Sequence, residues 1–138
     1  MQYRCSTSAF RSEVSKYYYL IYTLQYILNW LYLVMKRTII SEDGRFEWDE
    51  KKDLLNKKSH GFSFSEILEI FDDPAFLEGY DPDHSTQEDR YYGIGCLNNI
   101  LYIIAFYTIR DRIRIISARQ ADSDEQEAYN DYFKKIKC

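Results

Sequence analysis

The pattern of apolar, polar and charged positions divides the chain into two unlike parts. Residues 17–35 contain no charged side chain, but six tyrosines and three polar residues (Thr23, Gln25 and Asn29) interrupt their apolar surface. An uncharged segment of 19 residues is long enough to cross a bilayer core as a helix. Three interpretations stay open: a membrane anchor, an extra amphipathic helix, or translated upstream sequence that precedes a real start at Met35. We favour the third, with the anchor second.

From residue 45 onward the pattern becomes regular. Residues 46–48 predict a short strand, and Asp49 is a residue type that caps helices. A helix is therefore expected over residues 50–59. Gly61 would end it, because glycine readily adopts the left-handed conformation found at helix ends.

A second helix follows at once. Ser63 and Glu66 have the spacing of a capping box, and Pro74 ends the helical pattern. The apolar positions between them fall on one helix stripe, namely Phe64, Ile67, Leu68 and Phe71.

The second half of the chain reads mainly as strands. The Asn98-Asn99 pair predicts a two-residue hairpin turn, because asparagine tolerates a positive φ. Ser123 and Gln126 form a second capping-box pattern, which begins a final helix ending near Lys135. The expected strands are residues 75–80, 90–97, 100–109 and 112–119. The order β-α-α-β-β-β-β-α predicts an α+β fold, with a small, mostly antiparallel sheet and helices packed on one side.

Length and composition limit the functions that remain. We expect a domain over residues 45–138, preceded by an N-terminal extension over residues 1–44 that holds the apolar segment. The net charge of −4 gives no overall positive field for nucleic acid, so phosphate binding would need a local cluster. The three cysteines form no C-x-x-C pattern, which suits reduced thiols in a cytoplasmic protein. The sequence has no Gly-rich phosphate loop and no H-E-x-x-H zinc helix, and we expect neither a metal nor a cofactor.

The run from Arg112 to Arg119 is the strongest candidate for chemistry. Alternate side chains of a strand point to opposite faces, so Arg112 and Arg114 would share one face and Ile113 the other. Arg119 falls at the end of the strand. Such a face could hold a phosphate-bearing partner, or it could simply be the charged outer face of a strand. Periodicity alone favours the second interpretation.

Other candidates are individually weak. His60 could transfer protons near neutral pH, and Tyr107 could line a pocket or stack on a base, although capping and core packing are the commoner roles. The loop that holds Asp81, Asp83, His84 and Glu88 could bind a divalent cation. Its spacing matches no calcium loop, so surface ion pairs are preferred there.

Taken in order, these motifs resemble the BrnT toxin family. The resemblance covers about residues 46–129 and is most specific at the Phe71-Asp72-Asp73-Pro74 step and the Ile116-Ser117-Ala118-Arg119 run. It implies a RelE-like fold and the toxin half of a type II toxin–antitoxin system. Such a toxin is a metal-independent endoribonuclease that inhibits translation.

The resemblance also implies partners. The antitoxin would be a BrnA-like, ribbon-helix-helix DNA-binding protein that dimerises, neutralises the toxin and represses the shared operon. RNA would be the substrate, and operator DNA would be contacted only through the antitoxin. A cytoplasmic location is expected, with membrane anchoring through residues 17–35 as the alternative.

The resemblance assigns roles to residues of this sequence. Arg114 and Arg119 would stabilise the phosphorane formed when an RNA 2′-hydroxyl attacks its own phosphate, and His60 or Tyr107 would handle protons. The RNA-binding residues would be Lys52, Lys58, Arg90 and Arg112.

The chain departs from the family pattern at two places besides the extension. Ser59 stands where a basic residue usually precedes His60, and the usually arginine-rich C-terminal helix is acidic over residues 123–129, although Glu125 and Tyr129 are kept. An alternative function therefore stays open. The chain could be a degenerate, non-catalytic toxin that binds the antitoxin and acts only in operon autoregulation.

Overall fold

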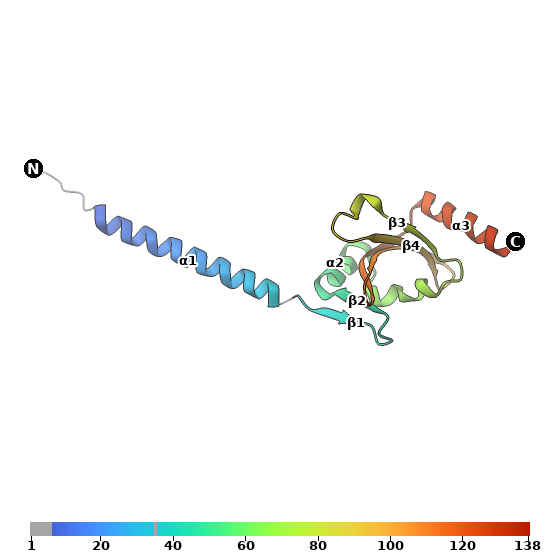
Figure 1. Cartoon of the computed structure of the whole chain (residues 1–138), viewed down its shortest axis with the longest axis horizontal. Helices are drawn as coiled ribbons and strands as arrows, with labels where there is room; N and C mark the ends of the chain where they lie inside the picture. Colours follow the sequence, from blue (N-terminus) through green and yellow to red (C-terminus); the bar gives the residue numbers. More distant parts are fainter. Residues whose placement is uncertain (1–6, 35) are drawn as a thin grey trace, which may run out of the picture. The chain divides into compact units, whose positions relative to one another are not determined.

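The computed structural model describes residues 7–34 and 36–138, which fall into two compact units, residues 1–36 and 37–138. In the first unit the structure describes the helix α1 (Thr7–Val34) and residue 36 (Figure 1). The side chains described within α1, those of residues 13–32, are all exposed. No helix within the described residues combines the length and the apolarity that crossing a bilayer requires.

The second unit is built on a six-stranded sheet, which confirms the predicted α+β class. The strands lie in the order β1-β2-β6-β5-β4-β3, and all neighbours are antiparallel except β2 and β6. Their bounds are β1 (Thr38–Ile40), β2 (Phe46–Asp49), β3 (Leu77–Tyr80), β4 (Arg90–Leu97), β5 (Leu101–Ile109) and β6 (Ile113–Gln120). As expected, β4 and β5 form a hairpin, whose turn residues Asn98 and Asn99 have φ values of 52° and 58°.

The first strand was not anticipated by the sequence pattern. β1 pairs with β2, so the compact unit begins at residue 37, whereas the sequence placed the start of the domain at residue 45. The turn between the two strands depends on Gly44, whose φ is 72°, and on Ser41, whose hydroxyl accepts the backbone N–H of Phe46 at 3.0 Å. A strand of three residues is too short to show the alternation of apolar and polar side chains that predicts strands. β1 is held in its extended conformation by its pairing with β2.

The helices begin and end close to their sequence signals. Asp49 caps α2 (Glu50–His60) by accepting the backbone N–H of Lys52, and Gly61 ends it at a φ of 84°. The segment η1 (Phe64–Asp72) is a 3₁₀ helix, and Glu66 accepts the backbone N–H of Ser63 at 2.7 Å, as the capping box requires.

The final helix, α3 (Ser123–Lys137), begins at the residue that the sequence predicted as its cap, and its actual cap lies one residue earlier. Its capping box joins Asp122 and Glu125, not Ser123 and Gln126. A carboxylate at residue 122 accepts the N–H of Glu125, and Glu125 accepts the N–H of Asp122, so the box closes one position upstream of the predicted pair. The remaining short 3₁₀ segment is η2 (Pro82–His84).

Helices cover both faces of the sheet, not one. Along β5, Ile103 and Ala105 belong to the core cluster that packs beneath η1, whereas Ile104 between them packs with Tyr129 of α3. Because alternate residues of a strand point to opposite faces, α3 lies on the face opposite η1. The prediction of one-sided packing was therefore wrong for α3, whose apolar stripe finds a second small core.

Candidate functional site

A bulge in β6 brings Arg114 and Arg119 onto the same face of the sheet. Simple alternation would place residues 114 and 119 on opposite faces, because they are five positions apart. Thr108 of β5 pairs with Arg114, and Ile104 pairs with Arg119, but the register shifts by one residue between these two points. The extra residue is Ile116. Thr108 and Ile104 point the same way, and so do the two arginines.

Arg90 completes this arginine face, which we define as the face of β4, β5 and β6 that carries Arg90, Arg114 and Arg119. Arg90, Thr108 and Arg114 are direct neighbours across three strands, and Glu47 of β2 extends the row beyond Arg114. Paired residues of adjacent strands share a face and lie within side-chain reach. Residues far apart in the sequence thus form one polar row.

Glu47 holds Arg114 in a half-buried ion pair. The Nη1 group of Arg114 donates to Oε1 of Glu47 at 2.9 Å, and the two side chains are 19% and 16% exposed. Only one of the five guanidinium N–H donors is used in this bond. The fixed geometry leaves further donors of Arg114 for an incoming oxyanion.

Glu125 holds Arg119 more completely. Both terminal nitrogens of Arg119 donate to the two oxygens of Glu125 at 2.8 Å, and its guanidinium lies 5.8 Å from the ring centre of Phe106. The Glu125 hydrogen bonds raise the pKa of Arg119 above its ordinary value. A bidentate carboxylate occupies the same donor fork that a phosphate would use.

At the edge of this face Arg110 pairs with Glu88, one of the loop residues for which the sequence predicted surface ion pairs. Arg110 donates to Glu88 at 2.6 Å. This bond, more than the charges of Arg90 and Arg114, holds the pKa of Glu88 below its ordinary value. The Nε atom of Arg90 is buried, with no hydrogen-bond partner within the part of the chain that the structure describes. The sequence did not single out Arg110, because nothing local distinguishes it from an ordinary turn residue.

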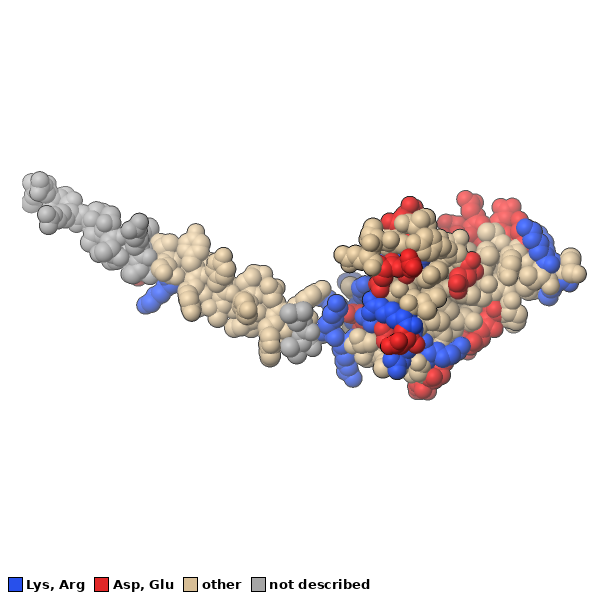
Figure 2. Space-filling view, in the orientation of Figure 1, with Lys and Arg blue, Asp and Glu red and all other residues tan. Residues whose placement is uncertain are grey.

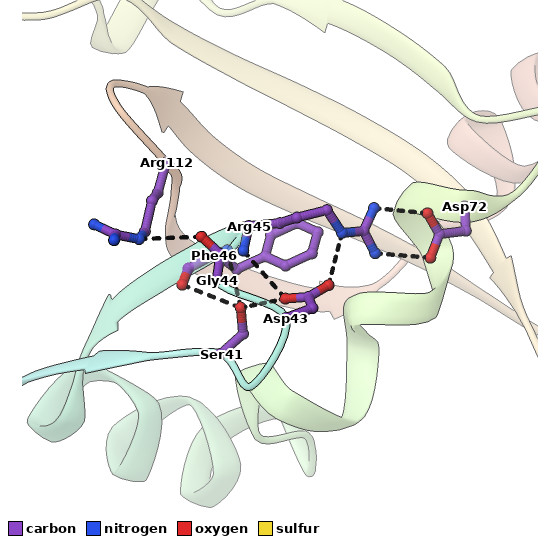
Figure 3. Close-up of polar contacts among 7 residues, drawn as sticks. All are labelled: Ser41, Asp43, Gly44, Arg45, Phe46, Asp72 and Arg112. Carbon is purple, nitrogen blue, oxygen red and sulfur yellow. Dashed lines mark hydrogen bonds and ion pairs between the residues drawn. The ribbon is translucent and has the colours of Figure 1, made fainter.

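Arg112 lies apart from the arginine face and contacts the turn between β1 and β2. Its Nε donates to the carbonyl oxygen of Gly44 at 3.0 Å (Figure 3). In the same turn Arg45 lies between Asp43 and Asp72 and bonds both carboxylates (Figure 3). The pKa of Asp43 falls to about 2, first because Ser41 and then because Arg45 hydrogen-bonds to it. This group joins the turn to η1.

The predicted proton carriers are not brought to the arginines. Tyr107 points to the opposite face, is 1% exposed and donates its hydroxyl to Glu78 at 2.5 Å. Burial and the Glu78 bond raise its pKa far above its ordinary value. His60 is exposed at the end of α2, and among the described residues no hydrogen bond or ion pair joins it to Arg114 or Arg119.

The other predicted binding residues are surface cations of α2. Lys52 and Lys58 are exposed, and so is their neighbour Lys57, which is bonded to Glu66. Figure 2 shows basic and acidic side chains interspersed over the visible face of residues 37–138, with no continuous basic surface. Phosphate binding by this unit would therefore rely on individually positioned arginines.

The acidic loop before β4 forms a surface ion pair, as preferred from its sequence. Nδ1 of His84 lies 2.9 Å from a carboxylate oxygen of Asp81. Among residues 7–34 and 36–138, no three His, Cys, Asp or Glu side chains are grouped closely enough to hold a metal ion.

Comparisons with known proteins bear on this arrangement. A family described as the ribonuclease toxin BrnT of type II toxin–antitoxin systems matches residues 48–125. The crystal structure of the Brucella abortus ribonuclease toxin BrnT is 28% identical over an alignment that covers 55% of this chain and 94% of that one, with a TM-score of 0.43. No curated protein matches.

Proposed function

Since this chain belongs to the BrnT family, the ribonuclease toxins of type II toxin–antitoxin systems, we propose that it is an endoribonuclease that uses the arginine face of its sheet. The matched residues include all three arginines of that face. The observation that carries the proposal is the bulge in β6, which places Arg114 and Arg119 on one face. Two guanidinium groups on one surface can neutralise a phosphodiester and the charge that develops on it.

The proposed reaction needs no metal ion. The 2′-hydroxyl oxygen of the RNA attacks the adjacent phosphorus, the O2′–P bond forms, and the P–O5′ bond breaks. A proton leaves the 2′-hydroxyl and another reaches the 5′ oxygen. Arg114 and Arg119 stabilise the phosphorane between these steps, because preformed donors act most strongly where charge develops. Arg90 holds a neighbouring phosphate, and Lys52, Lys58 and Arg112 steer RNA towards the face.

His60, and not Tyr107, carries out the proton transfers. The exposed imidazole can reach an RNA strand that crosses the end of α2, and imidazole is the side-chain group best suited to proton transfer near neutral pH. The hydroxyl of Tyr107 is buried on the wrong face and already donates to Glu78. Its burial serves packing against Phe71 and Tyr91.

The acidic partners of the arginines favour a second candidate function. Glu125 occupies the donor fork of Arg119, so an RNA phosphate must displace a carboxylate before it can bind there. In the alternative, that displacement does not occur, and the chain is a non-catalytic toxin homologue that binds the antitoxin and acts in operon regulation. A toxin of a type II system has an antitoxin partner. We propose that this partner is a BrnA-like ribbon-helix-helix protein, through which alone operator DNA is contacted.

Cleavage of RNA by the purified chain in EDTA distinguishes these functions. We expect wild-type protein to cut RNA, and Arg114→Ala with Arg119→Ala to lose at least 100-fold in rate, a size typical for removal of a preorganised donor. Arg37→Ala is the matched control. It removes an arginine whose side chain is 72% exposed and whose ion pair with Glu50 is long, at 3.8 Å.

Three results would count against the ribonuclease proposal. Full activity in a folded Arg114→Ala and Arg119→Ala variant would refute the roles of these arginines, and equal loss in Arg37→Ala would reduce them to general charge. Absence of cleavage by wild-type protein that still binds its antitoxin would support the regulatory alternative.

A further inference from the structure

The helix α1 exposes an uncharged, apolar surface over residues 17–32. Between residues 13 and 32, every large apolar side chain is at least 39% exposed. Residues 17–35 contain no Asp, Glu, Lys or Arg. Contiguous apolar surface of this extent marks an interaction site in most water-exposed proteins.

One tyrosine and the aliphatic residues of α1 form a stripe with heptad spacing. Tyr17, Leu20, Leu24, Ile27 and Leu31 follow one another at steps of three, four, three and four. On a helix with 3.6 residues per turn, this spacing gives a narrow seam, which is the pattern by which two helices pack side by side. Ile21 and Leu28 widen the stripe on one side. We call these seven residues the heptad stripe.

The side of α1 opposite the heptad stripe is different. Tyr19, Tyr22, Tyr26 and Asn29 lie there, each with a polar group that water can satisfy. The helix is thus aliphatic on one side and tyrosine-rich on the other. The Leu and Ile side chains carry no polar group, so covering them leaves no side-chain hydrogen bond with water to be replaced.

The sequence of α1 fits a second helix better than a lipid surface. Helices that lie on membranes carry Lys and Arg along their polar face, and α1 carries none from Tyr17 onward. No helix within the described residues meets the requirements for crossing a bilayer. An uncharged stripe can pair with an identical stripe without repulsion between like charges, as a two-fold symmetric contact requires.

We propose that the heptad stripe of α1 packs against the same stripe of a second copy and makes the chain a dimer. Burying a Leu- or Ile-sized side chain removes roughly 60–120 Å² from water. Seven such side chains would bury roughly 400–800 Å² on each copy, and stable interfaces bury about 800 Å² per partner. The stripe is therefore large enough for a dimer of moderate affinity. This inference is independent of the proposed ribonuclease activity.

Sedimentation of the full chain, with two matched double variants, tests the dimer. Leu20→Lys with Leu24→Lys places two charges in the stripe, and Tyr22→Lys with Tyr26→Lys places the same two charges, at the same spacing, on the opposite side. We expect wild type and the tyrosine variant to sediment at twice the 16.7 kDa mass of one chain between about 1 and 100 µM. The leucine variant should be monomeric, with dimer affinity reduced at least 100-fold.

Several outcomes would overturn the proposal. A wild-type monomer throughout the concentration range would do so, as would a leucine variant that stays dimeric or a tyrosine variant that dissociates equally. Flotation of a monomeric wild type with lipid vesicles would assign the stripe to a membrane surface instead. A thermal unfolding transition of residues 37–138 that is the same in all three proteins shows that the substitutions act through α1 alone.

Discussion

Replacing Asn56 should destabilise the sheet beside the arginine face more than any comparable polar substitution on the surface. β2 pairs with β6 only as far as Ile115, and beyond that point the edge of β6 is open. Asn56 of α2 fills the place of a neighbouring strand. Its Nδ2 donates to the carbonyl oxygens of Ala118 and Phe62 at 2.9 Å, and its Oδ1 accepts the N–H of Ala118 at 3.0 Å.

The size of the effect follows from these three bonds. Asn56 is 6% exposed and Ala118 is fully buried, so the backbone groups that Asn56→Ala would release have little access to water. A buried donor or acceptor left without a partner costs about 1–3 kcal/mol. We expect a loss of about 3–5 kcal/mol in the free energy of unfolding, a large part of the stability of a typical domain. Because Ala118 adjoins Arg119, RNA cleavage should fall as well.

Urea unfolding at a fixed protein concentration measures this loss. Asn130→Ala is the control, because within the described part of the chain Asn130 makes one side-chain bond, which is partly buried and in which it accepts the Tyr102 hydroxyl at 3.2 Å. It should lose about 1 kcal/mol or less. The reasoning fails if Asn56→Ala and Asn130→Ala are destabilised equally, or if Asn56→Leu, which cannot bond Ala118, unfolds at the wild-type urea concentration.

Two further predictions concern charged partners. Glu125→Gln keeps an oxygen that can accept the N–H of Asp122 but removes the charge that holds Arg119. The affinity for RNA, measured by fluorescence anisotropy, should therefore rise about 3–10-fold, an effect of about 1 kcal/mol. Unchanged affinity would show that Glu125 does not compete with phosphate. The Lys57 hydrogen bond is the largest cause that lowers the pKa of Glu66 to about 2. A carboxyl group with a lowered pKa stabilises the fold above about pH 4.5, and this stabilisation is lost as the pH falls towards 2. Lys57→Met should therefore raise the pKa of Glu66 in an NMR titration, and the free energy of unfolding should fall less steeply between about pH 4.5 and 2. An unmoved pKa would contradict the assignment to Lys57.

The run from Arg112 to Arg119 shows what a sequence pattern can and cannot predict. Alternation predicted that Arg112 and Arg114 would share a face, with Arg119 at the end of the strand. In the structure Arg112 bonds the turn at Gly44, and Arg119 joins Arg114 because Ile116 is an extra residue in the pairing. Nothing in the run from 112 to 119 reveals a bulge, since it depends on which residues of β5 lie opposite.

The expected role of Tyr107 in proton transfer is not supported by the structure, for a similar reason. A tyrosine in the middle of a strand can point to either face, and parity places it correctly only when the buried faces are known. Both faces of this sheet carry a core, one beneath η1 and one beneath α3. A buried tyrosine was therefore the commoner expectation in a chain with fourteen of them.

The sequence by itself determined the local features of this protein. Asp49, Gly61 and the Ser63–Glu66 box set the ends of α2 and the start of η1, because caps and turns satisfy backbone groups within a few residues of themselves. The order of its motifs also indicated the family. Only the tertiary structure decided that Glu47 and Glu125 hold the two arginines, that α3 covers the second face, and that Asn56 closes the edge of β6. Except for the short-range Arg119–Glu125 pair, these contacts join segments that are distant in sequence, and the register that creates them arises only when the strands pair.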